Sequence, residues 1–348
     1  MDIDGKSIGP SESPYFIAEA GVNHNGDLEL AEQLIDVAAD AGADAVKFQT
    51  FSADRLVTKD AEMANYQEET TDEESQHEML RRYELDRTAH ERLMDYCAAR
   101  AITFLSTPFD PESADMLADL GVPAIKVGSG ELDNHPLLKH IASLGLPMIV
   151  STGMGTMEEV HAAYEAMRKI DTDLPVVFLH CTSAYPAAVE DVNLRAMQSM
   201  DQRLPVLVGY SDHTTLPETP ALAVAAGASV LEKHFTVDST LPGPDHGTSL
   251  EPTELSRSVA MVEMAAKALG NSEKSPVDSE IENQTVSRKS LHAATDLEAG
   301  TTLSESHIKI ARPADGLSPR EYVEILGKTL ENSLSDGEPI TTEDLKSA

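Results

Sequence analysis

The chain has 348 residues, enough for one barrel-sized domain with a smaller second domain. Its 60 acidic and 26 basic residues give a formal net charge of −34, which excludes nucleic acid and anionic membrane surfaces as expected partners because both would be repelled. The only cysteines, Cys97 and Cys181, lack CxxC spacing, which excludes a disulfide framework and a thiolate metal site.

The distribution of charge and hydropathy also bears on location. The sequence shows neither a leader-like N-terminus nor an apolar stretch of 18 or more residues, so we expect a soluble, cytoplasmic protein. The acidic residues are spread over nearly all predicted helices, with the densest run at residues 67–78. We interpret this spread as a solvation adaptation to high salt, that is, a halophilic protein.

The first predicted elements are a hairpin, a strand and a loop. Asp4-Gly5 predicts a small hairpin within residues 1–14, and the apolar run that follows predicts a buried strand. The sequence AEAGVNHNG comes next, and His24 within it suggests a metal ligand. No second histidine stands two positions away, so we read this stretch as a loop with Asn25-Gly26 at the turn and keep a ligand role for His24 as the less favoured alternative.

Beyond this loop, strand and helix patterns alternate. An apolar-periodic helix is predicted over residues 28–42, entered through Asp27 as N-cap and left through Gly42. Eight short apolar or β-branched runs predict strands at residues 15–18, 45–48, 102–105, 124–127, 148–151, 176–180, 206–209 and 229–233. Eight strand-helix units in about 270 residues predict an α/β fold, a (β/α)8 TIM barrel, with a doubly wound sheet as the alternative.

The C-terminal part reads as a separate module. We place the barrel domain at residues 1–270, a polar linker without periodicity at 271–285, and a small domain at 286–348. The small domain contains an internal repeat, each copy predicting a turn, a short strand and a capped helical turn. The repeat matches Gly300, Leu303, Ser304 and Ile308 to Gly337, Ile340, Thr341 and Leu345.

Polar residues follow the predicted strands where each strand ends. In a barrel, all the carboxyl ends of the strands share one rim, so these residues would meet in one polar mouth. They are Glu19, Lys47, Gln49, Ser106, Thr107, Lys126, Ser129, Glu131, Ser151, Thr152, His180, Ser183, Ser211, Asp212, His213 and His234.

Two lysines stand out in this set. Lys47 and Lys126, in a strongly acidic chain and flanked by serine hydroxyls, would form a positive pocket for a phosphate or carboxylate. Buried ion pairs with Glu19 or Glu131 are the alternative.

Two histidines at adjacent strand ends point to a metal. His213 and His234 could hold a divalent ion such as Mn, Fe, Co or Zn, with further positions open to carboxylate, water or substrate. The alternative is a hydrogen-bonded pair of core histidines. Asp245, on the loop after the last predicted strand, could be a ligand or a base.

Nine motifs in register resemble one family. They are FIAEAGVNHNGDLELA, GADAVKFQTF, FLSTPFD, KVGSGELDN, IVSTGM, LHCTSAYPA, GYSDHT, EKHFT and LPGPDHGTSLEP, between about residues 13 and 270. Together they resemble the sialic acid synthases, which condense phosphoenolpyruvate with N-acetylmannosamine. The C-terminal module, with KIARPADGLSP, is similar to the antifreeze-like SAF domain of those enzymes.

The resemblance implies roles for individual residues. His213 and His234 would hold a divalent metal, typically manganese, with magnesium or cobalt as alternatives. Phosphoenolpyruvate would be bound by Lys47, Lys126, Ser129, Ser151, Ser183 and Ser211, although some members have asparagine at the position of Ser183. The sugar and reaction centre would be lined by Glu19, Gln49, Glu131, Tyr185 and Asp245.

The resemblance also implies a mechanism and an assembly. A metal would activate the open-chain aldehyde, C3 of phosphoenolpyruvate would attack it, water would add at C2, and phosphate would leave with C–O cleavage. Glu19 is the preferred residue for positioning or deprotonating the water, with Asp245 as its rival. Arg312 matches an arginine that reaches the partner's barrel and contacts the sugar's N-acyl group, so a homodimer with swapped SAF domains is expected.

Other functions compete with this reading. Legionaminic acid synthases, which use a 2,4-diacetamido sugar, share almost all the motifs, and residues 56–67 and 74–85 do not discriminate between the two groups. A pseudaminic acid synthase fits residues 129–131 and 242–245 less well. A metal-dependent barrel hydrolase would need an HxH pair where Asn23-His24-Asn25 stands, and an inactive glycan-binding protein would not need the lysines, histidines and Glu19.

Overall fold

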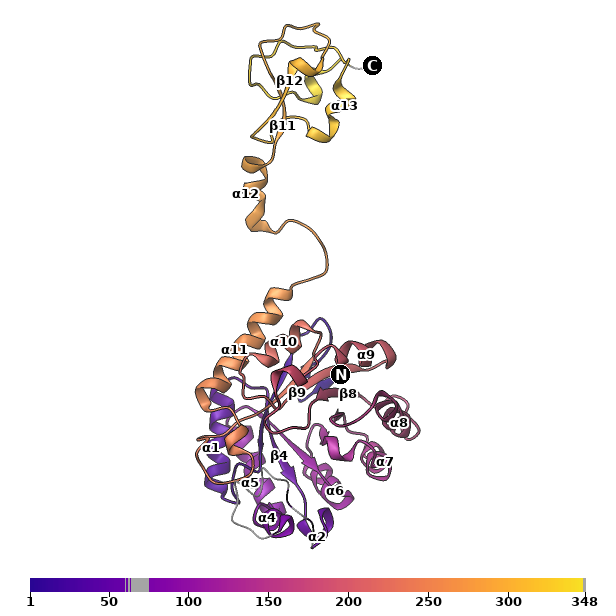
Figure 1. Ribbon diagram of the computed structural model, residues 1–348, viewed down its shortest axis with the longest axis vertical. Helices are drawn as coiled ribbons and strands as arrows, with labels where there is room; N and C mark the ends of the chain where they lie inside the picture. The colour runs from indigo at the N-terminus through magenta and orange to yellow at the C-terminus, as the bar shows by residue number, and fades with distance from the viewer. Residues whose placement is uncertain (60, 62, 64–74, 347–348) are drawn as a thin grey trace. The chain divides into compact units, whose positions relative to one another are not determined.

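The computed structural model describes residues 1–59, 61, 63 and 75–346. The chain divides into two compact units, Met1–Gly270 and Asn271–Ala348 (Figure 1). No described helix is both long enough and apolar enough to cross a membrane.

Eight parallel strands form the centre of the first unit. In the hydrogen-bonded sheet they follow the order β5-β4-β3-β10-β9-β8-β7-β6, and the two end strands β5 and β6 lie beside each other, so the barrel is nearly closed. This confirms the predicted (β/α)8 barrel over the doubly wound sheet. The strands are β3 (Tyr15–Gly21), β4 (Ala45–Thr50), β5 (Thr103–Pro108), β6 (Ile125–Val127), β7 (Met148–Ser151), β8 (Val176–Cys181), β9 (Leu207–Asp212) and β10 (Val230–His234).

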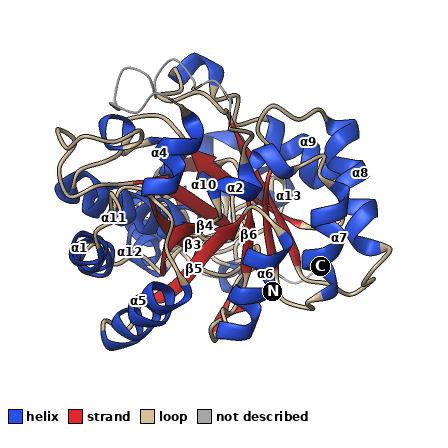
Figure 2. Cartoon of the chain, turned by 90° about the horizontal axis from the view of Figure 1, so that it is seen from below, coloured by secondary structure: helices blue, strands red, loops and turns tan. Residues whose placement is uncertain are grey.

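Helices surround these strands, which lie at the centre in Figure 2. In the first of them, Asp27 accepts a hydrogen bond from the Glu29 amide at 2.8 Å, and Gly42 beyond its end has a φ of 81°, as predicted. The helices of this unit are α1 (Leu28–Asp40), α2 (Ala53–Leu56), α4 (Gln76–Arg82), α5 (Arg87–Ala99), α6 (Pro111–Leu120), α7 (His135–Ser143), α8 (Met157–Arg168), α9 (Ala196–Arg203), α10 (Thr219–Ala225) and α11 (Pro252–Leu269).

The strand side chains alternate between two environments. Those pointing outward pack with the helices in the main core of the unit. Those pointing inward near the strand starts are apolar and form a second core, the lower half of the barrel interior: Tyr15, Ile17, Ala45, Leu105, Ala124, Ile149, Val177, Leu179 and Val230.

The predicted N-terminal hairpin joins this second core. Strands β1 (Asp2–Ile3) and β2 (Lys6–Ser7) pair antiparallel across a turn in which Asp4 and Gly5 have φ values of 53° and 79°. Ile3 and Ile8 are buried in the lower half of the barrel interior. The hairpin therefore adds apolar side chains to the end of the barrel that carries no predicted site residue.

Two residues beyond the lower half on the same strands, the inward side chains become polar. Glu19 follows Ile17, Lys47 follows Ala45, and Lys126 follows Ala124 at this spacing. We call this set the upper half of the barrel interior; it consists of Glu19, Lys47, Thr107, Lys126, Ser151, Ser211 and Glu232, all buried.

The second unit is a small β-rich module with its own apolar core. It contains α12 (Asp278–Ser287), the antiparallel strands β11 (Ser290–Ala293) and β12 (Ile308–Ala311), and α13 (Tyr322–Ile325). The sequence predicts a linker without periodicity at 271–285, yet most of α12 lies there. None of its residues is buried, so no apolar face marks it in the sequence, although Glu280 accepts a hydrogen bond from the Val277 amide at its start.

The turns and capped turns of the internal repeat are confirmed, but each predicted short strand is reduced to an isolated bridge, at Thr302 and at Pro339. Gly300 and Gly337 both have positive φ, 88° and 91°, as the predicted turns require. The capped turns are single 3-10 turns at Glu305–His307 and Thr342–Asp344. Leu303 and Ile340, the matched apolar positions, are both buried in the module's core.

Candidate active site

A cavity of about 370 Å³ opens at the carboxyl ends of the barrel strands. Each of the eight strands, or the loop directly after it, contributes to its lining, as the barrel predicts. The predicted site residues that line it are Glu19, Lys47, Gln49, Lys126, Ser129, Ser151, Ser183, Tyr185, Ser211, His213, His234 and Asp245.

Two predicted site residues are not brought to this cavity within the first unit. Glu131 lies on the 3-10 turn Ser129–Glu131 but is not among the lining residues, and its Oε2 accepts a hydrogen bond from Asn134 Nδ2 at 2.6 Å. Residues 129 and 130 of this turn line the cavity, whereas the Glu131 carboxylate bonds to the N-cap residue of helix α7. Arg312 follows β12 in the second unit.

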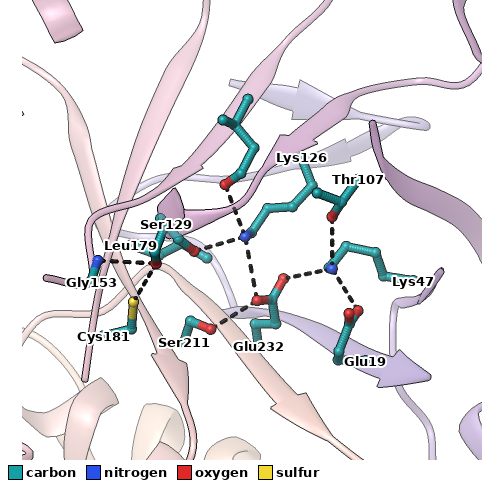
Figure 3. A network of polar contacts seen from close by, with 12 residues as sticks. Glu19, Lys47, Thr107, Lys126, Ser129, Gly153, Leu179, Cys181, Ser211 and Glu232 are labelled. Carbon is teal, nitrogen blue, oxygen red and sulfur yellow. Dashed lines mark hydrogen bonds and ion pairs between the residues drawn. The ribbon is translucent and has the colours of Figure 1, made fainter. Parts of the chain in front are cut away.

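The floor of the cavity is a buried network of two lysines and two glutamates (Figure 3). Lys47 Nζ lies 2.6 Å from Glu19 Oε2 and 3.6 Å from Glu232 Oε2, and Lys126 Nζ lies 3.5 Å from Glu232 Oε1. The alternative that the sequence left open for Lys47, a buried pair with Glu19, is therefore present. The pocket is not a pair of uncompensated lysines, because Glu232 lies between them.

Glu232 was missed by the sequence reasoning. It is 4% exposed and accepts a hydrogen bond from Ser211 Oγ at 2.8 Å. Burial by itself would raise the pKa of Glu232, but Lys126 and Lys47 lower it to about 2, so this carboxylate stays ionised. The two-residue period of an inward strand face, Val230, Glu232, His234, is the signal that could have found it.

Glu19 behaves differently from Glu232. Burial raises the pKa of Glu19 to about 7, an effect that Lys47 only partly offsets and that the neighbouring Glu232 reinforces. Near neutral pH, Glu19 can therefore take up a proton. When it does, two lysines face one carboxylate and the floor carries a net positive charge, which favours an anionic ligand.

A second carboxyl group lies close to Glu19. Gly21, at a bulge that ends β3, has a φ of 54°, and a Cβ atom there would lie 3.3 Å from Asp245 Oδ2, 3.4 Å from Glu19 Oε1 and 3.6 Å from Gln49 Nε2. Burial raises the pKa of Asp245 to about 6, opposed by Lys47. Three polar groups thus meet around a position where glycine leaves room, and two of them titrate near neutrality.

The serine side of the cavity is built around Gly153. A Cβ atom at this position would lie 2.1 Å from Ser183 Oγ and 2.9 Å from Ser129 Oγ, and the Gly153 amide donates to Ser129 Oγ at 3.0 Å. On the same side, Lys126 Nζ donates to Ser151 Oγ at 2.7 Å. Ser183 Oγ is buried and makes no hydrogen bond to the described residues, so it is available to a ligand.

The two predicted metal ligands, His213 and His234, lie next to each other in the lining of the cavity. The rings of His213 and His234 have centroids 5.6 Å apart, and His213 Nδ1 donates to the Thr182 carbonyl at 2.7 Å, which leaves Nε2 with its lone pair. Burial lowers the pKa of both histidines, so both rings are neutral. His234 Nδ1 is buried without a hydrogen-bond partner among the described residues.

Two neutral imidazoles fit a divalent ion, because the metal ligand is the unprotonated ring nitrogen. The described residues contain no group of three or more histidine, cysteine or acidic side chains arranged to hold a metal ion. The protein would thus supply two ligands and leave the other positions to water or substrate.

A buried ion pair lies directly behind these histidines. Asp212 and Lys233 precede His213 and His234, are register partners on β9 and β10, and face outward. Lys233 Nζ donates to Asp212 Oδ2 at 2.7 Å and to the Thr214 carbonyl, with both charged side chains at most 1% exposed. This pair ties the strand ends together and so positions the two rings.

His24 is buried in the loop after β3 and is not among the cavity-lining residues. Its Nδ1 accepts a hydrogen bond from the Gly26 amide at 3.0 Å, and Asn25 and Gly26 have φ values of 52° and 76°. The interpretation of this stretch as a turn into α1 is confirmed. Cys97 and Cys181 are also buried and free, as predicted.

Comparison with known proteins identifies relatives along the whole chain. The model of the NeuB family matches residues 34–274, and that of the SAF domain matches residues 288–346. The N,N'-diacetyllegionaminic acid synthase of Legionella pneumophila is 44% identical, over 98% of this chain and 97% of that protein. The protein of the same name from Campylobacter jejuni is 45% identical, over 93% of this chain and 98% of its own length.

Solved structures agree with this result. The crystal structure of an N-acetylneuraminic acid (sialic acid) synthetase from Leptospira borgpetersenii, in complex with citrate, superposes with a TM-score of 0.73 at 36% identity. The match covers 81% of this chain and 94% of that one.

Proposed function

The chain belongs to the NeuB family, and we propose that it condenses phosphoenolpyruvate with the open-chain aldehyde of an N-acylated mannose-type sugar and water, giving a sugar acid and phosphate. The observation that carries the proposal is one cavity that is lined both by Lys47 and Lys126 and by the pair His213 and His234. The lysines suit a phosphorylated carboxylic acid, and the histidines suit a metal that polarises an aldehyde.

For the acceptor sugar we propose 2,4-diacetamido-2,4,6-trideoxymannose, which makes the chain a legionaminic acid synthase. The sequence motifs favour N-acetylmannosamine, with this sugar as the alternative. The comparisons support the 2,4-diacetamido sugar as the first choice. Two relatives named N,N'-diacetyllegionaminic acid synthase are 44% and 45% identical to this chain, whereas the structure named as a sialic acid synthetase is 36% identical. N-acetylmannosamine is retained as the second candidate.

Phosphoenolpyruvate would bind along the lysine and serine side. Lys47 and Lys126 would neutralise its carboxylate and phosphate, and the hydroxyl groups at Ser129, Ser151 and Ser183 would donate hydrogen bonds to its oxygens. Ser211 would join them by turning its hydroxyl away from Glu232.

A divalent ion, manganese by our expectation, with magnesium or cobalt as alternatives, would be held by His213 and His234 and supply a Lewis acid for the aldehyde oxygen. The chain's own residues do the rest. Gln49, Tyr185 and Asp245 line the cavity beside the histidines and would hold the sugar's hydroxyl and acetamido groups. The floor lysines keep C3 of phosphoenolpyruvate oriented toward the aldehyde carbon.

The bonds then change in a balanced sequence. C3 of phosphoenolpyruvate forms a bond to the aldehyde carbon, whose oxygen takes up a proton, and C2 gains oxocarbenium character. Water adds to C2 and gives up a proton, for which Glu19 is the preferred acceptor and Asp245 its rival, since their pKa values are about 7 and about 6. The bond from C2 to the phosphate ester oxygen breaks, the remaining hydroxyl proton leaves, and a keto acid and phosphate are released.

Phosphate release tests the proposed function. Purified protein with Mn²⁺ and phosphoenolpyruvate is assayed with each of the two sugars, with and without chelator. We expect release with the 2,4-diacetamido sugar that stops on chelation. Glu19→Gln should abolish turnover and leave the metal content unchanged. No release with either sugar would contradict the proposal and favour a glycan-binding protein.

We also propose a homodimer in which Arg312 of the SAF module completes the partner's active site, as the family resemblance implies. Mixing Arg312→Ala chains with Glu19→Gln chains should restore part of the activity, since one site of the mixed dimer would hold both intact residues. Exchange of subunits is verified by mass spectrometry of differently tagged chains. Absence of activity after verified exchange would count against a shared site.

A further inference from the structure

The active-site cavity has two unlike sides. Besides the charged floor and its serines, the cavity is lined by apolar side chains from three separate segments. We call this set the apolar wall; it consists of Val22, Met79, Leu80, Tyr83 and Phe109.

The apolar wall is a separate small core. Val22 follows β3, and Phe109 follows β5. Met79 of α4 and Tyr83, the residue directly after this helix, stand four positions apart. Together with Phe51 they form a hydrophobic cluster distinct from both barrel cores. The rings of Phe51 and Phe109 pack edge to face, with centroids 6.0 Å apart and an interplanar angle of 77°.

The apolar wall is well packed, because most of its side chains are buried. Met79 is 1% exposed, Tyr83 3% and Val22 5%, while Leu80 and Phe109 are half-buried and line the cavity. The cluster supports these two side chains from behind, so they can present an apolar surface to a ligand without collapsing.

Phosphoenolpyruvate does not need such a surface. Its carboxylate and phosphate are charged, and an apolar wall would remove their water without replacing its hydrogen bonds. The charged floor and the serines already supply the groups that an anion requires. The apolar wall therefore serves the second substrate, the sugar.

We infer that the apolar wall binds the apolar groups of the acceptor sugar, the C6 methyl group and the methyl group of the 4-acetamido substituent, and so selects a 6-deoxy diacetamido sugar over N-acetylmannosamine. This inference rests on the proposed function and deepens it. N-acetylmannosamine would place hydroxyl groups at C4 and C6 against carbon, where they would lose hydrogen bonds to water. An apolar pocket discriminates by one or two such groups roughly 10- to 200-fold.

Two variants test the inference by introducing a polar group into the wall. Leu80→Gln places an amide at a half-buried position, and Val22→Thr replaces a methyl with a hydroxyl at nearly constant shape. Leu222→Gln is the matched control, because Leu222 lies on α10, is 56% exposed and does not line the cavity. For each protein, kcat and KM are measured with both sugars, and KM for phosphoenolpyruvate is measured separately.

For the wild type we expect kcat/KM to favour the 2,4-diacetamido sugar at least tenfold. Both wall variants should lower that ratio about tenfold, mainly through KM of the deoxy sugar, while KM for phosphoenolpyruvate stays within about twofold. The control should leave the ratio unchanged. A structural defect would raise KM for phosphoenolpyruvate as well, so that readout separates the two causes.

Three outcomes would overturn the inference. Equal kcat/KM for the two sugars in the wild type would contradict the inference that the apolar wall selects the sugar, but it would not contradict the proposed condensation. An unchanged sugar ratio in both wall variants would show that another part of the cavity sets the preference. Phosphate release with neither sugar would overturn the proposed function itself, and the inference with it.

Discussion

The two halves of the barrel interior differ although the same strands build both. In the lower half the inward side chains are apolar and pack with the N-terminal hairpin. Two residues further along, the upper half carries Lys47, Lys126, Glu19 and Glu232, all at most 4% exposed. The lower half therefore stabilises the fold by burying apolar surface. The upper half holds buried charges, which are tolerated because each one lies near a charge of opposite sign.

This difference teaches that stability and chemistry are separated along the barrel axis. Changes in the upper half should alter reactivity and pKa values, and changes in the lower half should alter only the free energy of unfolding. The outer faces of the same strands matter as well, because the pair Asp212 and Lys233 lies behind the histidines of the upper half. Four experiments test this separation.

The largest effect is expected for Lys233→Met. This change leaves Asp212 buried without its partner, so the free energy of unfolding should fall by about 3–5 kcal/mol. Because the pair ties β9 to β10, the affinity for Mn²⁺ should fall too, measured by calorimetry alongside urea unfolding. The double variant Asp212→Leu with Lys233→Met is the control and should recover stability but not Mn²⁺ affinity. A loss below about 1 kcal/mol would mean that the pair does not hold the strand ends.

Lys126→Met, in the upper half, should weaken the use of phosphoenolpyruvate. Removing this charge from the cavity floor should lower kcat/KM for phosphoenolpyruvate roughly 10²- to 10³-fold. The matched change in the lower half is Ile149→Val on the neighbouring strand, which should cost about 0.5–1.5 kcal/mol of stability and leave KM unchanged. Steady-state kinetics measures the catalytic effect of each variant, and thermal unfolding measures its effect on stability. A kinetic defect in Ile149→Val would break the separation of the two halves.

The pH dependence of Glu19 should follow from burial. Its pKa rises from 4.5 to about 7, so an ionised Glu19 acting as base makes kcat/KM rise as pH increases through about 7. For stability the sign is the opposite, because a raised pKa in the folded protein stabilises it below pH 4.5, and this contribution is lost as pH rises through about 7.

The loss is up to about 3 kcal/mol and is measured by urea unfolding at pH 5 and pH 8. Glu19→Gln should reduce this pH dependence, and the remainder should come from Asp245, whose pKa burial raises to about 6. An equal slope in wild type and Glu19→Gln would show that another group titrates.

The smallest effect is expected from salt, which should change the contribution of the exposed charges to stability but not that of the buried charges. At molar salt the Debye length is about 3 Å, so repulsion among exposed acids is screened and buried pairs are affected little. If the net charge of −34 reflects a halophilic protein, the melting temperature should rise by roughly 5 °C between low and molar salt. The difference in stability between wild type and Lys233→Met should stay constant. Melting independent of salt would contradict the halophilic interpretation.

Much of the architecture could be predicted because it depends on local patterns. The apolar runs placed all eight barrel strands within a few residues, and Asp27 and Gly42 marked the first helix. The helix α12 was missed because none of its residues is buried, so the sequence carries no apolar stripe to reveal it.

The candidate site shows where prediction from sequence stops. Strand-end position was enough to find the two lysines and the histidine pair. It also selected Glu131, whose side chain turns toward Asn134. It overlooked Glu232, which lies two residues before the strand end and is found by the two-residue period of the strand instead.

The sequence by itself determined which residues form strands, which strand ends carry reactive groups and which segment forms a separate module, because these features follow from spacing along the chain. Only the tertiary structure decided that Glu232 lies between two lysines and that Val22, Leu80 and Phe109 share one wall. The physical reason is that contacts across a barrel join residues far apart in sequence, and their partners depend on strand order, register and side-chain direction together.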